Sequence, residues 1–138
     1  MKISAKVVNS RGQHQVAVST NDIVHALKIP PKASGFGSSI NGGELLFLAL
    51  ATCFCNDLYR EANKMGIEVE QVEVEVSGDF GAEGDPAQNI SYTTRVTAKA
   101  TEGEIRELVN QTDRLAEIHN TLREGIQVQI AGIEAVTI

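Results

Sequence analysis

The chain has 138 residues, of which 42% are hydrophobic and 22% are charged. This length and composition are typical of a globular protein with a buried core, and they exclude a disordered chain. The net charge of −6, without any run of lysine or arginine, argues against nucleic acid as a partner, because phosphate binding needs clustered basic side chains. We therefore expect a single folded domain over residues 1–138.

The distribution of apolar residues and cysteines predicts where the protein works. No continuous apolar segment of the kind that directs secretion follows Met1. The longest apolar stretch, residues 45–55, is shorter than the ~20 residues needed to cross a bilayer, so we expect no membrane partner. Cys53 and Cys55 lie about 200° apart around one predicted helix and cannot form a disulfide without unwinding it. A reducing cytoplasm is the expected location.

The N-terminal third predicts antiparallel strands followed by a loop. Residues 2–8 and 13–20 alternate polar and apolar side chains around a turn, which indicates a hairpin, and residues 21–27 are a candidate third strand. Residues 29–43 (IPPKASGFGSSINGG) are rich in proline, glycine and serine and predict a long loop. Loops of this length are often functional, although a surface loop without a function is the alternative.

The segment after the loop predicts a long helix from Glu44 to Met65 that ends at Gly66. Its N-terminal half is apolar on all sides, so it must be covered by sheet, by other helices or by a second subunit. Glu44 lies in the first turn, where a carboxylate complements the helix dipole.

The rest of the chain predicts a hairpin, a second helix and a final strand. Residues 67–80 and 90–100 alternate like strands, with a slip at Gln71. Thr101 begins a helix with a capping box, and its apolar stripe continues to Leu122. Residues 126–138 alternate again and predict a closing strand. The order ββ-α-ββ-α-β defines an α+β fold with antiparallel sheet and two long helices.

Three segments of the sequence carry a family resemblance. They are residues 38–53 (SSINGGELLFLALATC), residues 65–78 (MGIEVEQVEVEVSG) and residues 117–126 (EIHNTLREGI). Together they are similar to the OsmC/Ohr family of thiol-dependent hydroperoxide reductases. The resemblance spans nearly the whole chain and implies the OsmC-like fold, an intertwined homodimer with its long helices buried between two sheets.

The resemblance places Cys53 at the peroxide-reactive cysteine of the family, but two partners of that thiol are missing. Ala116 occupies the position of the second, resolving cysteine. No arginine occurs between Arg11 and Arg60, where the activating arginine of the family would lie. The chain is therefore more similar to the divergent OsmC-like branch, which lacks the second cysteine.

A peroxide-reactive cysteine must be a thiolate near neutral pH. Lowering its pKa from ~8.5 to neutrality takes about 2 kcal/mol, whereas burial in an apolar helix raises the pKa. A cation ~4 Å away supplies about 4 kcal/mol at an effective dielectric constant of ~20. One well-placed cation would therefore decide whether the thiol reacts.

Several residues are candidates for a role beside Cys53. His119 lies on the apolar stripe of the second helix and is a candidate thiolate partner, with a core histidine bonded to the backbone as the alternative. The catalytic glutamate of the family aligns one residue before Glu44, so Glu44 is a candidate catalytic residue or only a helix cap. Lys28, Lys32 and Phe36, in or beside the loop, are candidate binding residues, with solvated surface residues as the alternative.

Two functions fit these residues. In the first, Cys53 reduces a small hydrophobic hydroperoxide, becomes a sulfenic acid and is restored by an external dithiol reductant. In the second, the same homodimer binds a small hydrophobic ligand or senses redox state without turnover. No ligand pair has the spacing of a zinc motif and no nucleotide fingerprint occurs, so we expect neither metal nor cofactor.

Overall fold

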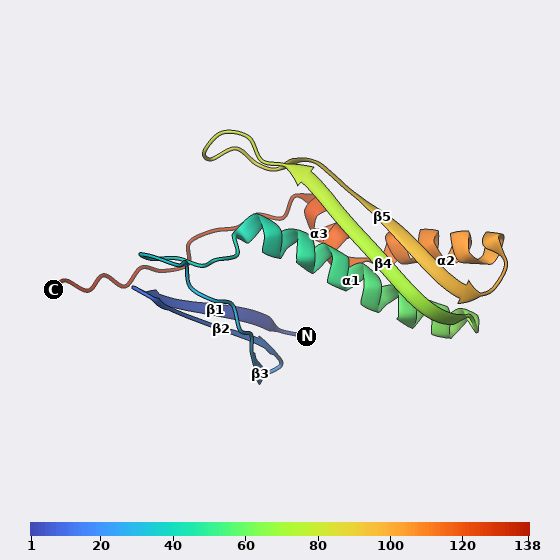
Figure 1. The fold of residues 1–138 in the computed structure, drawn as a ribbon, viewed down its shortest axis with the longest axis horizontal. Helices are drawn as coiled ribbons and strands as arrows, with labels where there is room; N and C mark the ends of the chain where they lie inside the picture. The colour runs from blue at the N-terminus through green and yellow to red at the C-terminus, as the bar shows by residue number, and fades with distance from the viewer. The chain divides into compact units, whose positions relative to one another are not determined.

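The computed structural model describes residues 1–138 in two compact units, Met1–Leu46 and Phe47–Ile138. The elements follow one another in the order β1-β2-β3-α1-β4-β5-α2-α3 (Figure 1). The predicted α+β class is confirmed. None of the three helices has an apolar stretch long enough to span a bilayer.

The first unit contains a three-stranded antiparallel sheet. Strands β1 (Ile3–Ser10), β2 (Gln13–Thr20) and β3 (Ile23–Ala26) pair in sequence order, which confirms the predicted hairpin and the candidate third strand. Gly12 makes the β1–β2 turn with φ +70°, a backbone conformation that glycine adopts without strain. Apolar side chains on β1 and β3 are more than half exposed, namely Ile3, Val7, Val8, Ile23 and Val24.

The predicted loop is held against the β1–β2 turn by its own hydrogen bonds. The Asn9 side chain donates to the Gly37 carbonyl at 3.2 Å, and the Gly37 N–H donates to Asn9 Oδ1 at 3.0 Å. The Arg11 guanidinium lies over the Phe36 ring, 4.9 Å from its centroid. These contacts fix the path of residues 27–41, which form neither a helix nor an extended strand.

Helix α1 (Gly42–Met65) is the predicted long helix, and a capping box begins it. The Glu44 N–H donates to Asn41 Oδ1 at 2.8 Å, and the Asn41 N–H donates to the Glu44 carboxylate at 3.1 Å. Two backbone donors that helix geometry leaves free are satisfied in this way. Gly66, with φ +68°, ends the helix.

The second unit has its core between α1 and the β4–β5 hairpin, and Figure 1 shows the hairpin running along the helix. Strand β4 (Glu68–Asp79) pairs antiparallel with β5 (Gln88–Lys99), and the register shifts between Val69 and Gln71, as the slip predicted. Alternate valines of β4 face the core while its glutamates are exposed. The buried centre comprises Phe54, Leu58, Ala62 and Leu108.

The single second helix predicted through Leu122 is wrong, because the chain breaks it in two. Helix α2 (Glu102–Leu115) begins with the predicted capping box, and α3 (Glu117–Glu124) follows after Ala116, whose ψ of 104° is extended. Neither proline nor glycine causes the break. Side chains of α3 stabilise it instead, since Asn120 donates to the Arg114 carbonyl at 3.0 Å and Arg123 donates to the Asp113 carbonyl at 3.1 Å.

The closing strand predicted for residues 126–138 is also wrong in the single chain, where this segment has no secondary structure. Its alternation suits a strand, but a strand forms only where another strand offers a free edge for its hydrogen bonds. No such pairing forms within the chain. Its large apolar side chains are strongly exposed, and the lowest value is 63%, at Ile126.

Candidate functional site

Cys53 lies on α1 with its side chain half-buried, and it is a free thiol. Its Sγ donates a hydrogen bond to Asp57 Oδ2 at 3.4 Å, one helical turn further along the same face. The backbone N–H of Ile118, in the first turn of α3, lies near the same sulfur and acts to lower the pKa of Cys53. The break at Ala116 therefore positions the start of α3 at the thiol.

Two carboxyl groups and one guanidinium complete what we call the thiol–carboxyl cluster, made of Cys53, Asp57, Arg60 and Glu117. Asp57 is only 6% exposed, and its Oδ1 accepts a hydrogen bond from Arg60 Nη1 at 2.9 Å. Glu117 lies 3.6 Å from the same guanidinium nitrogen. The sulfur and one oxygen from each carboxyl group lie within 4.8 Å of one another. The cation of this cluster is already supplied by the chain, as Arg60.

The electrostatics of the cluster keep the thiol protonated. Burial raises the pKa of Cys53, and the charges of Asp57 and Glu117 act in the same direction, while the Ile118 N–H opposes them without prevailing. Burial also raises the pKa of Asp57, and its hydrogen bond with Glu117 adds to this effect. The pKa of Glu117 is lowered by its own backbone N–H and by the hydrogen bond with Asp57. Asp57 is therefore the carboxyl group of this pair that holds a proton more readily.

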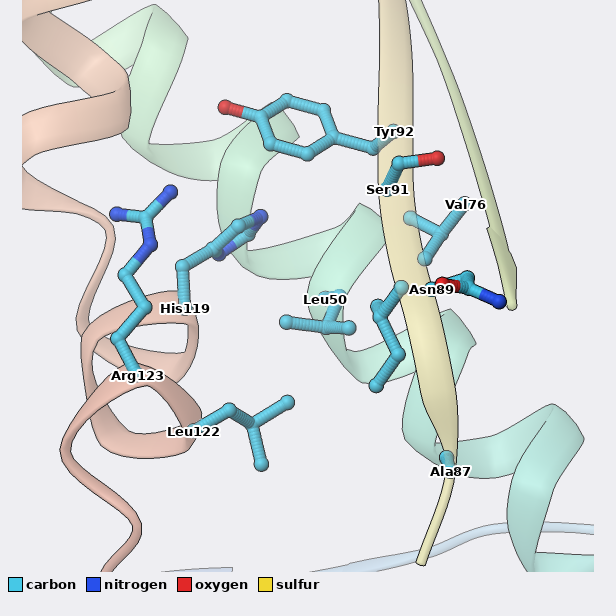
Figure 2. Close-up of a pocket in the computed structure, with 10 residues that line it drawn as sticks. Leu50, Val76, Ala87, Asn89, Ser91, Tyr92, His119, Leu122 and Arg123 are labelled. Atoms are coloured by element: carbon cyan, nitrogen blue, oxygen red, sulfur yellow. The ribbon is translucent and has the colours of Figure 1, made fainter. Parts of the chain in front are cut away.

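A cavity of about 540 Å³ lies close to the thiol–carboxyl cluster. Figure 2 shows Leu50 of α1, Tyr92 of β5, and His119 and Leu122 of α3 around it. Leu50 precedes Cys53 by almost one helical turn of α1. His119 directly follows Ile118, whose backbone N–H lies near the sulfur. The lining is mainly apolar, which suits a hydrocarbon group.

His119 is a buried polar residue in the lining of this cavity. It is 5% exposed, and neither Nδ1 nor Nε2 has a hydrogen-bond partner. Its ring packs edge-on against Tyr92, with centroids 4.9 Å apart. Burial lowers the pKa of His119, and the nearby Arg123 charge adds to this effect, so the ring is neutral at pH 7. Neither a hydrogen bond to Cys53 nor one to the backbone is present.

The other residues selected from the sequence lie outside the thiol–carboxyl cluster. Glu44 uses its carboxylate in the capping box of α1. Lys28, Lys32 and Phe36 are exposed residues of the first unit. The roles of these three residues in binding stay predictions.

Three residues that contact or surround the thiol were not predicted from the sequence. Asp57 and Arg60 follow Cys53 by four and seven positions, which places all three on one face of α1. The spacing of these charged residues on an otherwise apolar helix could have indicated that they lie beside Cys53. No sequence pattern could have indicated that Glu117 lies near the thiol, because its position depends on the break at Ala116.

Fold and site together define an α+β protein with a half-buried thiol on its long helix. The family model described as "OsmC-like protein" matches residues 35–131, and the chain belongs to this family. The match runs across both compact units. No protein among curated sequences matches the chain.

Solved structures of low sequence identity share the fold. An OsmC-like protein from Mycoplasma pneumoniae is 21% identical over 88% of this chain and 86% of its own, with a TM-score of 0.61. An OsmC-like protein of unknown function from Vibrio cholerae is 15% identical over 88% of this chain and 93% of its own, with a TM-score of 0.59. The organic hydroperoxide resistance protein OhrB of Bacillus subtilis is 21% identical over 89% of this chain and 91% of its own, with a TM-score of 0.54.

Proposed function

We propose that the protein is a thiol-dependent reductase of small organic hydroperoxides, with Cys53 as the reacting group. The observation that carries this proposal is a half-buried thiol, hydrogen-bonded to Asp57, close to an apolar cavity. Membership of the OsmC-like family and the similarity to the organic hydroperoxide resistance protein OhrB of Bacillus subtilis support a role in peroxide stress.

In the proposed reaction, the sulfur of Cys53 attacks the terminal oxygen of the hydroperoxide. The O–O bond breaks, the thiol is oxidised to a sulfenic acid, and the peroxide is reduced to an alcohol. Two thiol groups of an external dithiol then reduce the sulfenic acid, forming a disulfide and water. The reductant must come from another molecule, because Ala116 stands where a second cysteine would be.

We also propose that the working form is a homodimer in which the two compact units act as one domain, in the reducing cytoplasm. The exposed apolar faces support this assembly. Leu48 on α1 is 60% exposed. Several apolar residues of β1 and β3, and those of segment 126–138, are exposed to a similar or greater degree. Large exposed apolar surfaces of this kind mark interaction sites.

One observation favours a second function, the binding of a small apolar ligand without turnover. The pKa of Cys53 is raised rather than lowered, and a protonated thiol is a poor nucleophile. The cavity with the unpaired ring of His119 offers a ligand both apolar walls and a hydrogen-bonding group.

Peroxide consumption separates the two functions. Purified protein is mixed with cumene hydroperoxide and dihydrolipoamide, and loss of peroxide is followed for the wild type, Cys53→Ser and the matched control Cys55→Ser. We expect turnover that Cys53→Ser abolishes and Cys55→Ser retains. No consumption by the wild type, together with a measured Cys53 pKa above ~8.5, would reject the reductase and favour ligand binding.

A further inference from the structure

The charged group that is hydrogen-bonded to the Cys53 thiol is a carboxyl group and not a cation. Asp57 Oδ2 lies 3.4 Å from the sulfur, whereas Arg60 bonds to the other carboxyl oxygen, Oδ1, at 2.9 Å. Arg60 therefore fixes the orientation of Asp57 while leaving Oδ2 free for the thiol. A carboxyl group held in this position is suited to accept a proton.

We propose that Asp57 is a catalytic residue that takes the proton of the Cys53 thiol during attack on the hydroperoxide, and that Glu117 is a positioning residue for Asp57. This role rests on the proposed function. As the S–O bond forms and the O–O bond breaks, the thiol proton moves to Asp57. The departing alkoxide then receives this proton and leaves as an alcohol, which returns Asp57 to its starting state.

The charges around the cluster are compatible with this transfer. From α1, Asp57, Arg60 and Glu61 face the site, and Arg60 Nε donates to Glu61 at 3.0 Å, so the guanidinium is shared between carboxylates. From α3, Glu117 approaches Asp57, and two carboxyl groups this close resist ionising together. On β5, the hydroxyl of Tyr92 donates to Asp113 and not to the cluster. Glu117 therefore controls how readily Asp57 holds a proton.

A purely electrostatic role for Asp57 predicts the opposite outcome of its removal. A negative charge beside the thiol raises the thiol pKa, so replacing Asp57 with asparagine lowers that pKa and increases the thiolate fraction. If charge were the whole effect, the variant would react faster at neutral pH. If Asp57 accepts the proton, the variant reacts more slowly although its thiol is more acidic.

The test compares Asp57→Asn with the matched control Glu61→Gln in a Cys55→Ser background. Glu61 is also a buried carboxyl residue of α1 that bonds to Arg60, but it makes no hydrogen bond to the thiol. The rates of Cys53 oxidation by cumene hydroperoxide and of its alkylation by iodoacetamide are measured between about pH 5 and pH 10. We expect Asp57→Asn to lower the oxidation rate at neutral pH about 100-fold, and Glu61→Gln to lower it far less. A faster Asp57→Asn variant overturns the proposal.

The alkylation profile tests Asp57 even if the proposed function fails. A wild type that reacts with no hydroperoxide at any pH rejects the reductase. Its alkylation rate should still show an inflection from Asp57 below that of the thiol, and a single inflection overturns the proposal. If Asp57→Asn does not fold, as judged by circular dichroism, Glu117→Gln replaces it, since the Glu117 side chain is 66% exposed. This variant should move the lower inflection to lower pH, and an unmoved inflection overturns the proposal.

Discussion

Replacing His119 with leucine should stabilise the protein. The imidazole is 5% exposed, and both ring nitrogens lack partners. A buried polar group without a hydrogen bond costs about 1–3 kcal/mol, so removing these groups gains about 2 kcal/mol, while the lost ring contact with Tyr92 costs about 1 kcal/mol. Leucine has a similar volume and leaves little cavity. We expect a net gain of about 1 kcal/mol in the free energy of unfolding at neutral pH.

The gain from His119→Leu should grow as the pH falls. The pKa of His119 in the folded state is lowered below its unfolded value of ~6.5, so the unfolded state binds the proton more readily. The stability linked to the neutral ring is present above pH ~6.5 and is lost as the pH falls from there toward the folded pKa. The leucine variant lacks this loss, so the difference widens by about 1 kcal/mol per pH unit over that interval.

Urea denaturation followed by circular dichroism measures both effects at several pH values. One protein concentration is used throughout, because association would add to the apparent stability. His25→Gln is the control, since His25 is exposed and should leave the difference near zero. A His119→Leu variant that is less stable than the wild type and keeps the same pH dependence would refute the reasoning, because it would mean that the ring nitrogens have partners in solution.

Two further substitutions test the folded core and a helix end by the same assay. Phe54→Ala should lower the free energy of unfolding by about 3–5 kcal/mol, because the ring is fully buried against Tyr92, and a loss below about 1 kcal/mol would contradict this packing. Thr101→Ala removes the side chain that accepts from the Glu104 N–H and should cost about 1 kcal/mol; an unchanged denaturation midpoint would argue against the capping box.

Local patterns in the sequence predicted most of the secondary structure. Strict alternation identified the strands of both hairpins, and the slip at Gln71 appears in the structure as a shift of register. The leucine- and alanine-rich segment formed α1, and Thr101 began α2 as its capping box predicted. In each case the decisive interactions lie within a few residues or between neighbouring strands.

The errors arose where particular side-chain contacts, rather than the pattern of apolar residues, decide the structure. The break at Ala116 depends on side chains of α3 that donate hydrogen bonds to carbonyls of α2, and no residue at the break itself predicts it. Cys53 was identified from its helix and family resemblance, but its acceptor Asp57 became evident only from the geometry of one helix face. Glu117 joined the cluster because of that same break.

The segment 126–138 gives the protein an internal reporter of association. Its backbone belongs to no helix or strand in the single chain, and its side chains are strongly exposed. Amide hydrogens in such a segment exchange with deuterium almost as fast as in an unstructured peptide, whereas those of a core helix exchange only through opening. Slow exchange at these amides must therefore come from contacts with another molecule. The exchange rate, followed as the protein is diluted, would measure the fraction of chains that have found a partner.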